Sequence, residues 1–355
     1  MNIGLTYNIK KENDSDNIYF SQSAAKYMNE NVIKNYPERI DDTYAEWDSE
    51  ETINAICEAI EYGGHTCHLI EANEDVYNNL RAIRPDLVFN VAEGFNGSSR
   101  ESQIPSILEM LDIPFTGSDS ISIGICHDKS RCKEILSYYK IPNPPFFISD
   151  GLIELRDNIF PKFVKPLHEG SSKGIYNSSV VNNPQELLRE VERIKDVYHQ
   201  SSLIENFVPG KEFTIAMIGN SSEVRVLPIV EINLDKVPEG FNKIYSYEVK
   251  WFFDTRENKL DIFKCPADID ELTYRSIEDI CKKTFNVLRL RDWSRIDVRL
   301  DENGTANIIE INPLPGILPD PNDNSCFPKA ARAAGMDYNQ VINEVLNQAI
   351  ERYNL

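Results

Sequence analysis

The sequence lacks the features that mark membrane, secreted and cysteine-metal proteins. No apolar run approaches the roughly 18–20 residues needed to span a bilayer, and no apolar segment follows the basic residues near the start. The seven cysteines are scattered and include no C-x-x-C pair. Such usage argues against a cysteine zinc site and against a disulfide framework. We therefore expect a cytoplasmic protein with reduced thiols and no membrane partner.

Runs of lysine and arginine are also missing. The net charge is −20 at pH 7, and an acidic surface repels phosphate backbones. Nucleic acid is therefore not an expected partner. The chain has neither an internal repeat nor a low-complexity segment, and its 355 residues suffice for roughly two to three domains with a sizeable core.

Strand and helix patterns alternate in the first 120 residues, although the polar segment 14–48 fits neither pattern. Such alternation predicts a parallel α/β sheet that ends near residue 120. The expected elements are strands at 2–7, 65–70 and 85–94, helices at 51–64 and 103–114, and a short extended piece at 115–119.

The remainder of the chain mixes helices with strands that lack a regular alternation. Pro184 stands in the first turn of one expected helix, a position that suits proline. The segment 237–261 is predicted to be an irregular charged loop. The expected elements are helices at 128–142, 184–198, 270–288 and 327–353, and strands at 202–208, 212–219 and 224–232.

Residues 294–312 predict a β-hairpin with carboxylates on one face. Side chains alternate along a strand, and a normal register brings Asp297 opposite Glu310. Like charges in that position are unfavourable unless a cation lies between them. Two carboxylates and the Asn312 amide oxygen are hard ligands of the kind that Mg²⁺ prefers, with Mn²⁺ as an alternative. The other interpretation is a solvated hairpin face, against which the rigid turn Asn-Pro-Leu-Pro-Gly argues.

Lys165 stands in a short apolar strand pattern and leads into the polar loop Glu-Gly-Ser-Ser-Lys-Gly at 169–174. Small residues let backbone N–H groups approach a phosphate closely. On this stretch alone, a strand followed by a surface turn explains the pattern as well.

Five segments together carry a family resemblance. FVKPLHEGSSKGI, LIENFVPGKEFTIAMIGN, EVKWFF, RIDVRLDENGTANIIEINPLPG and FPKAARAAGMDYNQVI occur in this order. They resemble the D-alanine–D-alanine ligases of the ATP-grasp superfamily, over roughly residues 85–350. The resemblance implies an α/β fold with three subdomains, which we expect at 1–122 (N-terminal), 123–212 (central) and 213–355 (C-terminal, with the metal site). It also implies a homodimer.

The same resemblance implies the roles of individual residues. Lys250 matches a lysine on a mobile loop that reaches the γ-phosphate, Arg295 matches an arginine that faces the acyl phosphate, and the Gly316 backbone faces the oxyanion. The metal ligands are again Asp297, Glu310 and Asn312. The residues implied to bind ATP are Lys129, Lys165, Ser171, Ser172, Glu205, Asn206, Phe207, Val208 and Glu212.

The substrate side departs from the family. The family holds its first D-alanine with a glutamate that follows a glycine- and serine-rich turn, whereas Glu12 is the only acid near that place here. Glu93 stands where the family has a histidine, and Trp251 where it has a tyrosine. Ser325 matches the serine that binds the acceptor's carboxylate. An amino-acid acceptor is therefore expected, and the departures argue against D-alanine as the donor.

The expected function is that of an ATP-dependent carboxylate–amine ligase, which forms an amide through an acyl phosphate. Its expected partners are a small carboxylic acid and an amino acid. The alternatives are a genuine D-alanine–D-alanine ligase of cell-wall synthesis, an ATP-binding protein without catalysis, and a phosphotransferase that stops at the acyl phosphate.

Overall fold

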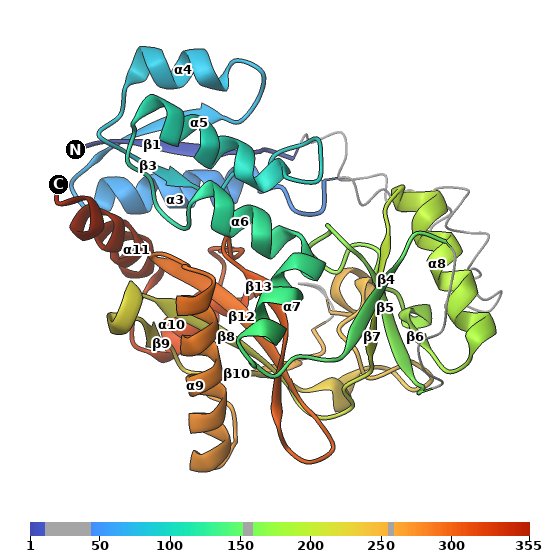
Figure 1. Ribbon diagram of the computed structural model, residues 1–355. Coiled ribbons are helices and arrows are strands. Elements are labelled where there is room, and N and C mark those ends of the chain that lie inside the picture. Colours follow the sequence, from blue (N-terminus) through green and yellow to red (C-terminus); the bar gives the residue numbers. More distant parts are fainter. Residues whose placement is uncertain (11–43, 152–158, 255–258) are drawn as a thin grey trace.

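A computed structural model describes residues 1–10, 44–151, 159–254 and 259–355 (Figure 1). These residues form three β-sheets with helices packed against them, and the two larger sheets are antiparallel. No helix in the described ranges has both the length and the apolar composition that a bilayer crossing requires.

The first sheet is parallel, as the sequence predicted, and has three strands in the order β2-β1-β3. Helix α4 was not predicted, because only Val76 and Leu80 of its eight residues are buried and the apolar pattern is too short to recognise. Residues 115–119 form no strand, and Phe115 makes only an isolated bridge to Val88. The elements are β1 (Asn2–Tyr7), α3 (Glu50–Tyr62), β2 (Thr66–Glu71), α4 (Val76–Ile83), β3 (Leu87–Asn90), η2 (Arg100–Ser102) and α5 (Gln103–Leu111).

Two helices, α6 (Ser120–His127) and α7 (Lys129–Tyr138), connect the first sheet to the second. Asp128 separates them, and its carboxylate caps α7 by accepting hydrogen bonds from the N–H groups of Ser130 and Arg131. The predicted helix 128–142 ends at Tyr138, since Lys140 adopts a left-handed conformation with φ 53°.

The second sheet is four-stranded, in the order β4-β7-β5-β6. Helix α8 covers it and buries Leu187, Val191 and Ile194, while the Asn183 side chain caps its first turn next to Pro184 as expected. The elements are β4 (Phe146–Ser149), β5 (Lys162–Pro166), η3 (Asn177–Ser179), β6 (Val180–Val181), α8 (Pro184–Tyr198) and β7 (Ser202–Asn206).

The third sheet has six strands, with the path β11-β10-β8-β12-β13 and β9 paired to β8. The single strand predicted at 224–232 is divided in two around Pro228, which cannot donate to a ladder. The terminal helix predicted at 327–353 is also divided, at Gly335 with φ 85°. The elements are β8 (Glu212–Ile218), η4 (Ser221–Glu223), β9 (Arg225–Val226), β10 (Val230–Ile232), η5 (Leu234–Lys236), the π-helix η6 (Val249–Phe253), β11 (Phe263–Lys264), α9 (Glu271–Val287), β12 (Trp293–Leu300), β13 (Ala306–Asn312), α10 (Cys326–Ala333) and α11 (Tyr338–Tyr353).

The beginning and the end of the chain share one hydrophobic core. Helix α11 lies against α3 (Figure 1), and the Asn343 side chain donates to the Ala59 carbonyl at 2.6 Å. A Cβ at Gly63 would lie 1.9 Å from the Asn343 Oδ1, so glycine is required for this contact. The subdomain boundaries near 122 and 212 stay predictions.

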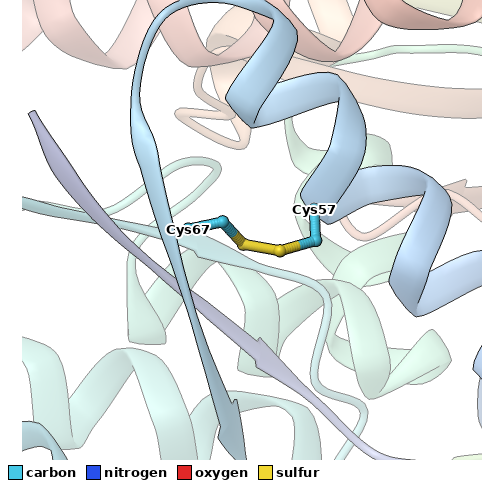
Figure 2. The surroundings of a disulfide bond; sticks show 2 residues. All are labelled: Cys57 and Cys67. Atoms are coloured by element: carbon cyan, nitrogen blue, oxygen red, sulfur yellow. A yellow bond between two sulfur atoms is a disulfide. The ribbon is translucent and has the colours of Figure 1, made fainter.

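A disulfide joins Cys57 of α3 to Cys67 of β2 (Figure 2). The prediction of seven reduced thiols is therefore wrong for this pair, while the other five cysteines are free. A tight turn after α3 brings β2 back beside the helix, so the two Cα atoms lie 5.6 Å apart, within the usual range for a disulfide. The positions of the two cysteines in the sequence did not indicate that they lie close together.

Candidate active site

A cavity of about 370 Å³ is lined by strands of the second and third sheets and by segments that connect the elements around all three sheets. Every site residue predicted from the sequence and described in the structure lines it, and Glu12 lies outside the described residues. The lining includes three sets of side chains: the hairpin group (Lys129, Lys165, Glu205, Asp297, Glu310), the tryptophan group (Lys10, Lys250, Trp251) and the acid group (Glu46, Asp48, Glu93, Glu101).

The hairpin places its carboxylates as the alternation of side chains predicted. Asp297 of β12 lies directly opposite Glu310 of β13, and Arg295 lies opposite Asn312. Arg295 donates to Asp297 at 3.0 Å, and the Asn312 side chain donates to the same carboxylate at 3.3 Å. The three predicted metal ligands therefore meet at one edge of the cavity, and cationic side chains balance their charge.

Lysines from the second sheet and from α7 reach this hairpin. The Lys129 ammonium lies 3.1 Å from Glu310 and donates to the Glu169 carbonyl. Lys165 of β5 lies 2.9 Å from Glu205 and donates to the Ile309 carbonyl at 3.2 Å. Burial alone would raise the pKa of Glu310, but Lys129, Lys165 and Arg295 outweigh it and lower that pKa to about 2.

Sequence reasoning missed Lys133, which is almost fully buried and forms an ion pair with Glu205. The sequence feature that could have identified Lys133 is its spacing of four residues from Lys129, because residues four apart on α7 lie on one face of the helix. The Glu205 carboxylate is thus held between Lys133 and Lys165. Burial would raise the pKa of Glu205, and the two lysines lower it.

Other residues predicted to bind ATP lie at the end of β7, just after it, and at the start of β8. Most of them contact side chains from other parts of the protein. The Lys162 ammonium donates to the Asn206 side chain at 2.9 Å, and the Arg299 guanidinium lies 5.0 Å from the centre of the Phe207 ring. Glu212 lies 3.6 Å from Arg299, and burial raises its pKa. Val208 also lines the cavity.

Residues 169–172 of the loop 169–174 line the cavity beside these strands. Ser171 and Ser172 both adopt left-handed conformations, with φ 50° and 60°. The Ser172 hydroxyl donates to the Tyr245 carbonyl at 3.0 Å, and Lys173 forms an ion pair with Glu169 at 2.9 Å. The loop is thereby joined to the segment that leads to Lys250.

The tryptophan group lies at the π-helix η6. The ammonium groups of Lys10 and Lys250 each lie 5.2 Å from the centre of the Trp251 ring. Burial, Arg295 and Lys10 together lower the pKa of Lys250 to about 8. The Trp251 indole N–H is buried and finds no hydrogen-bond acceptor in the described part of the chain.

The acid group surrounds the end of β3. One carboxylate oxygen from each of Glu46, Glu93 and Glu101 lies within 4.8 Å of the others. Glu46 forms an ion pair with Arg100 at 2.6 Å, and Glu101 forms one with His127. Burial, and then the charges of Glu101 and Glu46, raise the pKa of Glu93 well above its usual range.

Glu46 was missed in the sequence, although it stands just before Ser49, which caps α3. It occupies a cavity-lining place of the kind expected for Glu12, and its other oxygen accepts the Gly170 N–H at 2.9 Å. Its signal was an acidic residue directly before a helix start, a pattern that is too common to identify a site.

Gly316 and Ser325 lie together on the wall formed by the third sheet. The Ser325 hydroxyl donates to the Gly316 carbonyl at 3.1 Å and accepts the Leu318 N–H at 3.2 Å. This hydroxyl therefore fixes the turn after β13 against the start of α10.

Comparison with known proteins relates this cavity to a family. The family model described as D-ala D-ala ligase C-terminus matches residues 153–347. The chain is 33% identical to Uncharacterized protein y4sG of Sinorhizobium fredii, over 86% of this chain and 90% of that one. It is 31% identical to a D-alanine--D-alanine ligase of Alcanivorax borkumensis (81% and 85% covered) and 30% identical to one of Aquifex aeolicus (84% and 94% covered).

The fold matches as well. A crystal structure of D-alanine--D-alanine ligase from Bacillus anthracis complexed with ATP has a TM-score of 0.69, 21% identity, and coverage of 100% of this chain and 99% of that chain. The family, the α/β fold class and the class of enzyme predicted from the sequence are thus confirmed, while the roles of the individual site residues stay predictions. The chain belongs to the D-alanine–D-alanine ligase family and is an ATP-dependent ligase with an ATP-grasp fold.

Proposed function

We propose that the enzyme activates a carboxylic acid as an acyl phosphate and transfers the acyl group to the amine of an amino acid. The observation that carries the proposal is the meeting of Lys129 and Lys165 with Asp297 and Glu310 in one cavity, which Lys250 also lines. Cations and carboxylates are combined there as phosphoryl transfer requires.

The proposed chemistry follows from the poor reactivity of carboxylates. A carboxylate would have to expel oxide, so one of its oxygens first attacks the γ-phosphorus of ATP and releases ADP. The amine then attacks the acyl carbon, loses a proton, and inorganic phosphate leaves. Lys165, Lys250 and Arg295 are the cations that stabilise the negative charge developing on the phosphoryl oxygens and on the tetrahedral oxyanion.

The donor set of the hairpin fits Mg²⁺ and, as an alternative, Mn²⁺. Asp297 and Glu310 oppose one another, and the Asn312 side chain lies on the same edge. A divalent ion held there supplies Lewis-acid stabilisation of phosphoryl oxygens. In our proposal Lys129 and Arg295 orient the carboxylates through the contacts described above.

The proposed acceptor site includes Ser325 and Gly316, and the proposed donor site includes Glu93 and Trp251. The alternative of a genuine D-alanine–D-alanine ligase is favoured by the names of the relatives from Alcanivorax borkumensis and Aquifex aeolicus. Glu93 and Trp251 favour another donor, because an acid and an indole replace the residues that the family resemblance led us to expect.

The experiment is product analysis by mass spectrometry after incubation with ATP, Mg²⁺ and pooled carboxylic and amino acids. We expect an amide, ADP and phosphate in equal amounts. Hydroxylamine added in place of the amine should trap the acyl phosphate as a hydroxamate. AMP as a product, or nucleotide binding without any turnover, would contradict the proposal, and turnover with D-alanine alone would establish the alternative.

We further propose that the enzyme is a homodimer in the cytoplasm. The family resemblance supports the dimer, and consumption of ATP supports the location. Sedimentation of the purified protein tests the first. Cell fractionation tests the second, and recovery of the protein outside the cytosolic fraction would contradict the proposed location.

A further inference from the structure

Lys10 has no part in the function proposed so far, yet its side chain lines the cavity. Its backbone is fixed at the end of β1: the Lys10 N–H donates to the Asp48 carbonyl at 2.9 Å, and the Asp48 N–H donates to the Asn8 carbonyl at 3.1 Å. The Asn8 side chain in turn accepts the Gly94 N–H at 2.8 Å. Lys10 therefore extends from a well-anchored position.

The surroundings of Lys10 include the ammonium group of Lys250 and the carboxyl group of Asp48. Its ammonium and that of Lys250 lie at the same distance, 5.2 Å, from the centre of the Trp251 ring. Within the described ranges, neither lysine has an ion-pair partner within 4.0 Å, whereas Arg295 is paired with Asp297. Two partly buried ammonium groups without a counter-ion repel each other and favour an anionic ligand.

The titration behaviour agrees with this geometry. Burial lowers the pKa of Lys10, and the charge of Asp48 only partly opposes the shift. Burial also raises the pKa of Asp48 to about 7, so this carboxyl is a weak counter-ion near neutral pH. A ligand carboxylate would stabilise the charged form of Lys10 more effectively than Asp48 does.

The proposed reaction leaves this cation without a ligand. The carboxylate that reacts must face the phosphoryl group beside Arg295, Lys165 and Lys250, and Ser325 serves the carboxylate of an amino-acid acceptor. Lys10 is a further cation, for which the proposed reaction provides no anion. The Trp251 ring, which both ammonium groups approach, offers an apolar surface for the methylene groups that separate two carboxylates.

We propose that Lys10 binds a carboxylate that does not react, and that the preferred substrate is therefore an amino acid with two carboxylates, as in aspartate or glutamate. This proposal rests on the proposed function for the identity of the site. The recognition itself is a charge-assisted hydrogen bond in a partly buried cavity.

The test is a binding measurement by calorimetry, in the presence of Mg²⁺ and a non-hydrolysable ATP analogue. The probes are both enantiomers of aspartate and glutamate, with asparagine and glutamine as neutral controls of nearly the same shape. We expect at least one acid to bind about tenfold or more tightly than its amide, as loss of a charged hydrogen bond predicts. Equal binding of acids and amides, or binding of neither, would overturn the proposal.

The variants Lys10→Met and Lys10→Arg separate recognition from folding. Lys10→Met should abolish the preference for the acid over the amide, and Lys10→Arg should retain most of it. Lys282→Met is the matched control, because Lys282 is partly exposed on α9 and does not line the cavity. A preference that survives in Lys10→Met would refute the role of Lys10.

Turnover gives an independent readout. With the acid found in the binding assay as substrate, Lys10→Met should raise the KM for that acid about tenfold and leave the KM for ATP unchanged. If acids bind through Lys10 but no amide forms, the proposed function fails and the assignment of Lys10 stands. If amides form and Lys10→Met leaves the KM for the acid unchanged, the assignment of Lys10 fails and the function stands.

Discussion

The hairpin group and the tryptophan group differ in whether their charged side chains form ion pairs. In the hairpin group, Lys165 is paired with Glu205 and Lys129 with Glu310, and Arg295 pairs with Asp297, so each carboxylate has a cationic partner without any ligand. In the tryptophan group, Lys10 and Lys250 share one aromatic ring and have no counter-ion within 4.0 Å among the described residues. The first arrangement holds its own shape, whereas the second is completed by what binds to it. We infer that the hairpin group and Lys250 serve the reaction common to the family and that Lys10 and Trp251 select the substrate.

The largest expected effect tests the balance of the hairpin group. Glu205→Ala leaves Lys133 and Lys165 as buried charges without a partner, so we expect the free energy of unfolding to fall by about 3–5 kcal/mol. Urea denaturation measures it. The control is Glu278→Ala on the surface of α9, whose pair with Lys282 should contribute only about 0.3–0.5 kcal/mol. Equal losses in the two variants would mean that the pairing in the hairpin group is no stronger than a surface contact.

The next effect separates catalysis from folding. Lys165→Met removes a cation from the cavity and should lower kcat by roughly 10²–10³, the loss typical when one preorganised electrostatic contact is removed. Steady-state phosphate release measures it, and thermal unfolding of the same variant shows whether the fold persists. A folded Lys165→Met protein with unchanged kcat would remove this lysine from the mechanism.

The pH profile tests the tryptophan group. Lys250 has a pKa of about 8, so its charged form is present below that pH and is lost as the pH rises. If charged Lys250 binds substrate, kcat/KM should fall about tenfold per pH unit above pH 8, since this ratio reports the free enzyme. Lys250→Arg keeps the charge and should move the fall to higher pH. A profile that stays flat up to about pH 10 would contradict the prediction.

The smallest effect concerns Glu93. Its raised pKa means that the folded state binds more protons than the unfolded state above the ordinary glutamate pKa of about 4.3. Stability is therefore lost as the pH rises through this window, by at most about 1.4 kcal/mol per pH unit. Glu93→Gln removes this dependence, so the variant should gain stability relative to the wild type as the pH increases. If the free energies of unfolding of the two proteins changed with pH in parallel, the protonation of Glu93 would not differ between the folded and unfolded states.

The hairpin could be predicted because it depends on short-range rules. Alternation along β12 and β13 predicted which side chains share a face, and a shift of register between Asp297 and Val298 brings Asp297 opposite Glu310. Lys165 followed from the resemblance, since its strand and loop occur together in the family. These features need no knowledge of how distant parts of the chain pack.

The rest depends on distant packing. Cys57 and Cys67 meet because β2 returns beside α3, and Lys10 faces the cavity because Asp48 pairs with the end of β1. Neither contact leaves a periodic signal. Lys133 looked like an ordinary helix lysine until the second sheet supplied Glu205 beside it. The unpredicted residues are thus those whose partners lie in another part of the chain.

The contact between α3 and α11 has a consequence for biosynthesis. Ile56 and Ile60 of α3 pack in one core cluster with Val345 and Leu346 of α11. While the polypeptide is being made, the first sheet must keep this apolar face exposed until the final helix has left the ribosome. Nascent chains stalled before α11 should therefore bind chaperones through the face of α3, and release of the complete chain should end that binding.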